Sequence, residues 1–482
     1  MKSLRTRAAR GTLINTAFAA ALGALGLLES FILARFVTRS AYGVWGVLAV
    51  TLGTFLWLKQ VGVGDKYVQQ DEADQELAFQ QAFTLELAFT AALTVLLLAS
   101  VPVIVLAYGL PQLIAPGLVV AAALFVSTWQ APQWVFYRRM DFGRQRALAA
   151  VDPVVGFAVS VALAVAGAGY WAFVGGLAAG ACAASGAAVL KSPVALRLRY
   201  EPGTLRSYAR FSGPLLVASG ASLVIAWSAM IAAKLDLGVG ALGVVALTAT
   251  IAGFAERVDQ LVTGTLYPAI CAVRENRQLL YESFVKSNRL ALMWAVPFGF
   301  ALTLFAPDLV RFGIGTRWRP AVVVLQVYGA AAALNHLGFN WTAYFRALGK
   351  TRPIAVAAVT AMAVFLAVGI PLLLIWGLPG FAVGVALQGL AALACRAYYL
   401  RSVFPGFDML RHAARSLLPT LPGAAVVLAL RAVERHPRTL VLALGELAVY
   451  ALVTITATWW AEASLLREAV GIVRGQDPAP AH

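Results

Sequence analysis

The sequence predicts an all-α membrane protein that crosses the bilayer fourteen times, with both termini in the cytoplasm. Hydrophobic residues make up 61% of the 482 residues and charged residues only 12%, which is typical of a polytopic membrane protein. Apolar stretches follow one another from end to end, and each has the roughly 20 residues that a helix needs to cross the hydrocarbon core. Lysine and arginine are concentrated in alternate loops, as the positive-inside rule requires.

The apolar stretches leave almost no chain for a soluble domain. The first follows basic residues, as a signal peptide does, but it is too long and carries Glu29, so we expect it to be retained. In chain order the predicted spans are 13–36, 42–62, 79–108, 113–136, 148–168, 171–190, 212–233, 241–267, 291–310, 320–345, 354–376, 379–400, 416–433 and 439–461.

The excess of basic residues fits a membrane topology better than a nucleic-acid partner. The chain carries 38 lysines and arginines against 22 acids, a net charge of +16. With the N-terminus inside, 27 basic residues fall in cytoplasmic segments and 9 in outer segments, while Lys59 and Arg257 lie within spans. An even number of spans preserves this bias, so both termini are predicted to be cytoplasmic. Membrane lipids are the partners that this charge indicates.

Three local patterns recur about 200 residues apart, at equivalent boundaries between spans. Spans 1–6 and 7–12 are therefore predicted to be two copies of one six-helix unit. Because six is even, both copies enter the membrane in the same direction, giving two parallel lobes around a central cavity. The paired segments are 134–146 with 341–352, 169–176 with 377–384, and 35–43 with 234–243.

The repeats also predict how the chain is organised. Two lobes are joined by a basic cytoplasmic connector, and two further spans and a cytoplasmic tail follow. The predicted segments are 1–190 (N-lobe), 191–211 (connector), 212–400 (C-lobe), 401–461 (spans 13 and 14) and 462–482 (tail).

Ionisable residues inside spans are the first candidates for function, because a charge in the bilayer is costly. Glu29 shares a polar, small-residue face of span 1 with Asn15, which suggests a cavity wall or an inter-helix hydrogen bond. In span 8, Glu256 and Asp259 share a helical face and are candidates for binding a coupling ion, H⁺ or Na⁺. Arg257 has no acid three or four residues away, so its partner is an anionic ligand or another helix. The alternative for this group is a structural ion-pair cluster.

Basic residues at span ends and neutral polar residues complete the candidate cavity. Arg35 and Lys234 are related by the repeat and depart from the inside bias. Such cations suit a pyrophosphate, and their alternative role is snorkelling to the interface. Neutral side chains would hydrogen-bond sugar hydroxyls, or else neighbouring helices. These neutral candidates are Gln130, Asn335, His336 and Asn340.

Four short turn motifs occur in a recognisable order along the chain. Together they resemble the turns of the multidrug/oligosaccharidyl-lipid/polysaccharide (MOP) flippase superfamily, in its polysaccharide-transporter branch, and the resemblance covers roughly residues 10–460. The motifs are LARFVTRSAYGVW at 33–45, LYPAI at 266–270, FGIGTRW at 312–318 and RALGKTR at 346–352.

The resemblance implies a flippase of the bacterial plasma (inner) membrane. It would move polyprenyl-pyrophosphate-linked oligosaccharide across the bilayer by alternating access of the two lobes, without a cofactor. Glycan assembly enzymes would be its partners in the cell.

Two other functions are open at this point. A drug/cation antiporter of the same superfamily is the first, and it would favour a cavity with more acids than bases. A membrane-embedded glycosyltransferase or polymerase is the second, but loops such as 307–320 are too short to carry its catalytic acids. The segment 348–351 resembles the end of a phosphate-binding loop but lacks its leading glycine. We therefore expect no enzyme activity, metal site or direct use of ATP.

Overall fold

A computed structural model gives the fold and is entirely helical in the part of the chain that it describes. The helices cluster into two compact units: an N-terminal unit, Leu13–Leu247, and a C-terminal unit, Thr248–His482 with Met1–Thr12. The described residues are 2–59, 63–69, 72–139, 141–201, 220–272, 275–348, 350, 352–434 and 437–473.

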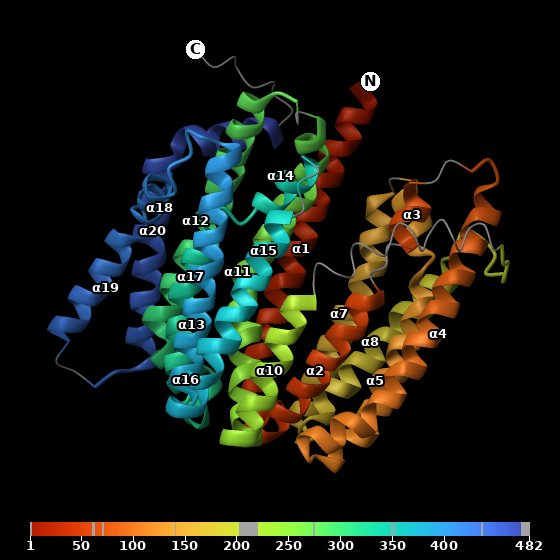
Figure 1. Ribbon diagram of the computed structural model, residues 1–482, viewed down its shortest axis with the longest axis horizontal. Coiled ribbons are helices and arrows are strands. Elements are labelled where there is room, and N and C mark those ends of the chain that lie inside the picture. Colours follow the sequence, from red (N-terminus) through yellow and green to blue (C-terminus); the bar gives the residue numbers. More distant parts are fainter. Residues whose placement is uncertain are drawn as a thin grey trace. The chain divides into compact units, whose positions relative to one another are not determined.

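The N-terminal unit is a bundle of long apolar helices, drawn in red to yellow-green in Figure 1. Its helices α7 and α8 pack along their length, and α5 packs against both α4 and α8. The elements are α1 (Lys2–Phe36), α2 (Arg39–Lys59), α3 (Val63–Gln69), α4 (Gln75–Tyr108), η1 (Pro111–Leu113), α5 (Ile114–Val126), η2 (Ser127–Gln130), α6 (Gln133–Arg138), α7 (Phe142–Val165), α8 (Trp171–Leu190), α10 (Gly220–Leu237) and the first part of α11 (Val239–Ala272).

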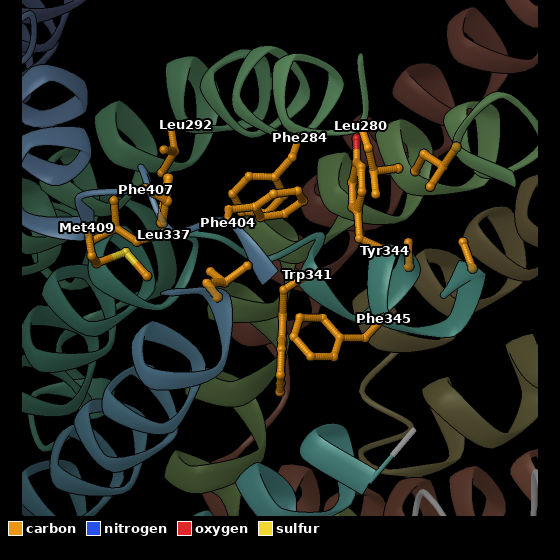
Figure 2. Close-up of a cluster of buried hydrophobic side chains, with 14 of the residues drawn as sticks. Leu280, Phe284, Leu292, Leu337, Trp341, Tyr344, Phe345, Phe404, Phe407 and Met409 are labelled. Atoms are coloured by element: carbon orange, nitrogen blue, oxygen red, sulfur yellow. The ribbon is translucent and has the colours of Figure 1, made fainter. Parts of the chain in front are cut away.

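The C-terminal unit is built around α12, which contacts α13, α14, α18 and α20. An aromatic core, shown in Figure 2, packs Phe284 of α12 against Tyr344 of α14 and against Phe404 and Phe407 after α17. The elements are α12 (Arg277–Asp308), η3 (Leu309–Ile314), η4 (Thr316–Trp318), α13 (Ala321–Asn335), α14 (Trp341–Ala347), α15 (Arg352–Val364), η5 (Phe365–Gly369), α16 (Ile370–Trp376), α17 (Leu378–Val403), α18 (Met409–Leu417), α19 (Leu421–Val433) and α20 (Leu440–Val473).

Short polar side chains start several helices where the chain enters an apolar stretch. Asp74 accepts the backbone N–H groups of Glu76 and Leu77 at the start of α4, and Asn276 does the same for α12. Such caps satisfy amide groups that have no partner within the helix. The long helices therefore begin at defined residues in the loops.

The prediction of an all-α membrane protein is confirmed. Each of the fourteen predicted stretches overlaps a helix, from Gly220 onward in the case of 212–233. Among the described residues, eight helices are long and apolar enough to cross a membrane, and the bent pair α18–α19 would make nine. The number of crossings, their orientation and the predicted lobe boundaries stay predictions.

Two of the sequence repeats adopt matching local structure. Trp134 lies at the start of the short helix α6, and its counterpart Trp341 starts the short helix α14. Gly169 and Gly377 both precede a long helix with positive φ, 61° and 65°. Glycine adopts this conformation without the strain that a side chain would bring. The repeat therefore extends from the sequence to the backbone.

Candidate functional site

Both predicted spans 4 and 10 are interrupted, and polar side chains gather at the interruptions. In the N-terminal unit, α5 passes into the 3₁₀ turn η2, and α6 begins only at Gln133; we call residues 127–132 the N-half break. In the C-terminal unit, α13 ends at Asn335 and α14 begins at Trp341; we call residues 336–340 the C-half break. Broken helices leave backbone groups that must find partners, because lipid offers none.

The N-half break is held by a buried ion pair between two neighbouring helices. Lys59, the last residue of α2, lies 3.4 Å from the Glu86 carboxylate of α4 and donates a hydrogen bond of 2.8 Å to the Ser127 hydroxyl. The side chains of Lys59 and Glu86 are only 15% and 6% exposed. On α8, Ser185 donates to the carbonyl of Val126 at 2.8 Å. Three helices thereby meet at the break.

Glu29 and Gln130 are also engaged inside the N-terminal unit. Ser160 of α7 hydrogen-bonds to the Glu29 carboxylate of α1. Gln130, at the break, hydrogen-bonds to Asp152 of α7. Each hydrogen bond joins two helices, and the functional roles predicted for Glu29 and Gln130 stay predictions.

The C-half break is held by amide, imidazole and guanidinium side chains. Asn288 of α12 donates to the carbonyl of His336 at 3.0 Å, and its Oδ1 accepts the backbone N–H of Gly338 at 3.1 Å. The Nε2 atom of His412 lies 2.5 Å from the same Oδ1. Arg396 of α17 donates from one nitrogen to the carbonyls of Asn335 and Leu337. The backbone at the break is thus hydrogen-bonded from two helices, α12 and α17, and His412 of α18 contacts the Asn288 side chain.

The three predicted residues at this end of α13 therefore lie together. His336 and Asn340 are buried, and the Asn340 amide donates to Ser287 of α12 at 2.5 Å. Asn335 lies against Gly389 and borders a cavity of about 340 Å³ between α12, α13 and α17. The cavity walls are mainly alanine and leucine, with polar groups from Thr303, Gln326 and Asn335 itself. Of the three residues, Asn335 is the one at the edge of this cavity.

The predicted cations Arg35 and Lys234 lie at corresponding helix ends. Arg35 is in the last turn of α1 and exposed, and Lys234 is in the last turn of α10 and half-buried. Both positions suit a cation, since the carbonyl end of a helix is electronegative. Their role toward a pyrophosphate stays a prediction.

The remaining candidates lie in described helices, but their side chains lie outside the described part. Asn15 is in α1, and the residues of the predicted coupling group are in the continuous helix α11. The role predicted for Glu256 and Asp259 stays a prediction. Arg257 occupies the next position along this helix.

An ion-pair network that the sequence analysis did not anticipate joins α12 to the last two helices. Asp308 and Glu446 both accept hydrogen bonds from Arg431 and Arg438, at distances of 2.6–3.1 Å. Glu434 adds a third carboxylate, 3.0 Å from Arg438. Hydrogen bonds to Asp308 and Glu446 hold the pKa of Arg438 above its ordinary value. Nearer the start of α12, Arg289 forms an ion pair with Glu462 of α20. The last two helices are thus tied to α12 at two levels.

Among the described residues, no cluster of histidine, cysteine, aspartate and glutamate has the geometry of a metal site. The two breaks and the ion-pair network consist of hydrogen-bonded and ion-paired groups within an apolar helical bundle. Such groups are costly in lipid unless they are paired, and they position helices rather than react.

Comparison with known proteins places this fold. The lipid II flippase MurJ in an inward closed conformation aligns with a TM-score of 0.64 at 12% identity, covering 94% of this chain and 99% of MurJ. An inward-facing multidrug resistance MATE family transporter of the MOP superfamily aligns with a TM-score of 0.63 at 13% identity, covering 82% and 100%. A MOP superfamily transporter from Pyrococcus furiosus aligns at 0.51 and 14%, covering 83% and 95%. The shared fold confirms the predicted resemblance, and these are folds of transporters rather than enzymes.

The sequence itself matches one family. No curated protein sequence matches the chain. The model of the polysaccharide biosynthesis protein family, however, matches residues 32–323, which is more than half of the chain. Together with the multi-pass membrane fold, this match shows that the chain belongs to the polysaccharide biosynthesis protein family.

Proposed function

We propose that the protein is a flippase that moves polyprenyl-pyrophosphate-linked oligosaccharide across the bacterial plasma membrane. One observation carries this proposal: a chain of the polysaccharide biosynthesis family has a fold that aligns over 94% of its length with a lipid II flippase. A lipid II flippase is, by its name, a protein that moves a lipid across the membrane. The proposal extends that class of cargo to this chain, with the glycan supplied by membrane-bound assembly enzymes.

The proposed mechanism is alternating access of two parallel lobes, spans 1–6 and 7–12, in a chain of fourteen spans with both termini inside. The number of spans is supported by the helix that overlaps each predicted stretch. The orientation is supported by the distribution of basic residues, 27 in the predicted cytoplasmic segments and 9 in the predicted outer segments. The matched backbone at Trp134 and Trp341 supports the internal repeat. Arg35, Lys234 and Arg257 are the cations that we propose for the pyrophosphate, while Glu256 and Asp259 are proposed to bind H⁺ or Na⁺.

A drug/cation antiporter is the second candidate, because the MATE fold also aligns well. The extent of alignment favours the flippase: MurJ covers 94% of this chain and the MATE transporter 82%. The acid of the N-half break also favours it, since Glu86 is already paired with Lys59 and is not free for a cationic drug.

The test is reconstitution of the purified protein in liposomes that carry a fluorescent polyprenyl-pyrophosphate oligosaccharide in one leaflet. We expect flipping by the wild type and a reduction of at least about tenfold in Arg35→Ala. The matched control is Arg401→Ala, at an exposed position of α17 that the proposed topology assigns to the cytoplasm, which should flip normally. Export of cationic dyes without flipping of the lipid would establish the antiporter instead.

The coupling ion is tested in the same liposomes with imposed pH or Na⁺ gradients. We expect the gradient to accelerate flipping by the wild type, and Glu256→Gln with Asp259→Asn to remove this acceleration. Equal wild-type rates with and without gradients would show that the supply of substrate alone drives transport.

A further inference from the structure

The helix α18 is a short helix that leads obliquely into the next predicted span. It has 9 residues, Met409–Leu417, so at 1.5 Å per residue it is about 14 Å long. A helix of that length covers only about half of the hydrocarbon core. The following helix α19 begins at Leu421, and the two helices are bent by 50°. This geometry suits a helix that runs partly along the membrane surface before the chain turns into the bilayer.

One side of α18 packs into the C-terminal unit. Met409 and His412 are buried, and the Nε2 atom of His412 lies 2.5 Å from the Oδ1 atom of Asn288 of α12. The opposite side carries large apolar side chains that are exposed: Leu410 is 77% exposed and Leu418 is 65% exposed. The helix is therefore fixed through its inner face, while its outer face presents leucine to the surroundings.

Two arginines lie beside these leucines on the outer face. Arg411 and Arg415 are four residues apart, which makes them neighbours on the helix surface, and both are exposed. Among the described residues, neither guanidinium forms an ion pair with a carboxylate. The acids of this region have other partners, since Asp408 caps the start of α18 and Glu462 of α20 pairs with an arginine of α12. The outer face thus combines two cations with exposed leucines.

The neighbours of α18 indicate its level in the membrane. Figure 1 shows α18 beside α20, and the two helices line one small cavity through Ser416, Thr458 and Glu462. At Glu462 the backbone of α20 leaves helical geometry, with φ at −123°. Just before this kink, Trp459 and Trp460 are exposed. Exposed tryptophans near the end of a span are typical of the membrane–water interface, so α18 lies at the level of the lipid headgroups.

The chemistry of the outer face selects one kind of partner. Cations are costly among acyl chains but are attracted to anionic headgroups, and an amphipathic helix with basic and leucine strips suits such a surface. A zwitterionic lipid fits less well, because its ammonium group offsets the charge of its phosphate. A second copy of the chain also fits less well, because a symmetric contact through α18 would bring like charges together.

We propose that α18 is an interfacial helix that binds an anionic glycerophospholipid of the surrounding membrane. The phosphate lies against Arg411 and Arg415, and the acyl chains run past Leu410 and Leu418. The bound lipid holds α18 against α12 and so stabilises the bend into α19. This inference needs only the multi-pass membrane fold, and its test uses no cargo.

The first test measures lipid binding to the full-length protein by native mass spectrometry, with phosphatidylglycerol and phosphatidylcholine as probes. We expect the wild type to prefer phosphatidylglycerol. Arg411→Ala with Arg415→Ala should lower the affinity for phosphatidylglycerol about 25-fold, at about fivefold for each cation, and leave the affinity for phosphatidylcholine unchanged. The matched control is Arg277→Ala with Arg352→Ala, which removes two exposed arginines at the starts of α12 and α15. Equal losses in the two double variants would overturn the site.

The second test separates a lipid site from a simple anion site in the same assay. Arg411→Lys with Arg415→Lys should keep the affinity for phosphatidylglycerol within about threefold, because an ammonium also binds phosphate as a point charge. Leu410→Gln with Leu418→Gln retains both cations and should weaken binding at least about fivefold, because contact with the acyl chains is lost. Undiminished binding by this glutamine variant, or displacement of the lipid by excess inorganic phosphate, would overturn the proposal.

The same spectra report the oligomeric state and so test the alternative occupant. We expect the alanine variant of the two arginines to lose lipid without any change in oligomeric state. A wild type that is dimeric, and an alanine variant that becomes monomeric with its lipid affinity unchanged, would assign the outer face of α18 to a second copy and overturn the proposal.

Discussion

Breaking the Lys59–Glu86 pair should be among the most damaging single changes in the N-terminal unit. The two side chains are 15% and 6% exposed, so removing one leaves a charge in an apolar interior. For such a pair, the loss of one partner lowers the free energy of unfolding by about 3–5 kcal/mol. We therefore expect Glu86→Leu and Lys59→Met each to destabilise by this amount. The double variant should recover most of the loss, because no charge then stays unpaired.

The assay is unfolding of the detergent-solubilised protein, followed by tryptophan fluorescence, for both single variants and the double variant. The matched control is the exposed pair Lys286–Glu282, whose side chains are 37% and 47% exposed at 2.7 Å. Removing either side chain of this exposed pair should lower the free energy of unfolding by no more than about 0.5 kcal/mol. The coupling free energy between Lys59 and Glu86 should exceed that of the exposed pair by about 1–3 kcal/mol. Single variants at Lys59 or Glu86 that are as stable as the control variants would refute the buried-pair reasoning.

Three further outcomes follow from described contacts. Arg438→Ala should lower the free energy of unfolding by about 3 kcal/mol or more, because it removes the ion pairs between α12 and α20. Hydrogen bonding raises the pKa of Arg438, so these ion pairs are fully formed in the wild type at every pH below the ordinary arginine pKa. The thermal stability of the wild type in detergent should therefore not fall between neutral pH and about pH 10. Gly176→Val should prevent folding, measured as monodisperse protein, because its methyl would overlap Ser160, whereas Gly186→Val has open space and should fold. Asn288→Ala should cost about 1–3 kcal/mol in the same unfolding assay, since it leaves the C-half break without its amide.

Hydropathy predicted the helices well because every long apolar stretch in lipid must be helical to satisfy its own backbone. It could not predict the two breaks. Residues 127–132 and 336–340 lie inside apolar stretches, and a break changes hydrogen bonding without changing average hydropathy. The polar residues near 336–340 were a local signal, which we interpreted as candidate contacts for sugar or for neighbouring helices. The structure shows that His336 and Asn340 belong to the hydrogen bonding at the break.

Charge partners were harder to predict than charged positions. Lys59 was recognised as a basic residue within a span, but its partner Glu86 lies in the following span, and helical spacing relates residues only within one helix. The same holds for Asp308, whose arginine partners lie more than 120 residues later. For Glu29, Ser160 of another helix is a hydrogen-bond partner, and its two predicted roles, in a cavity wall or between helices, stay predictions.

The two breaks indicate what the repeat preserves. Both interrupt the fourth span of their repeat, both are followed by a short helix that begins near a tryptophan, and both are held from neighbouring helices. Their chemistry differs, because a lysine–glutamate pair holds one, whereas the Asn288 amide and the Arg396 guanidinium donate to backbone carbonyls at the other. The preserved feature is therefore the interruption itself, and each half satisfies it separately. A protein whose two halves change their mutual arrangement, as we propose, needs bundles that stay rigid internally, and these buried contacts supply that rigidity.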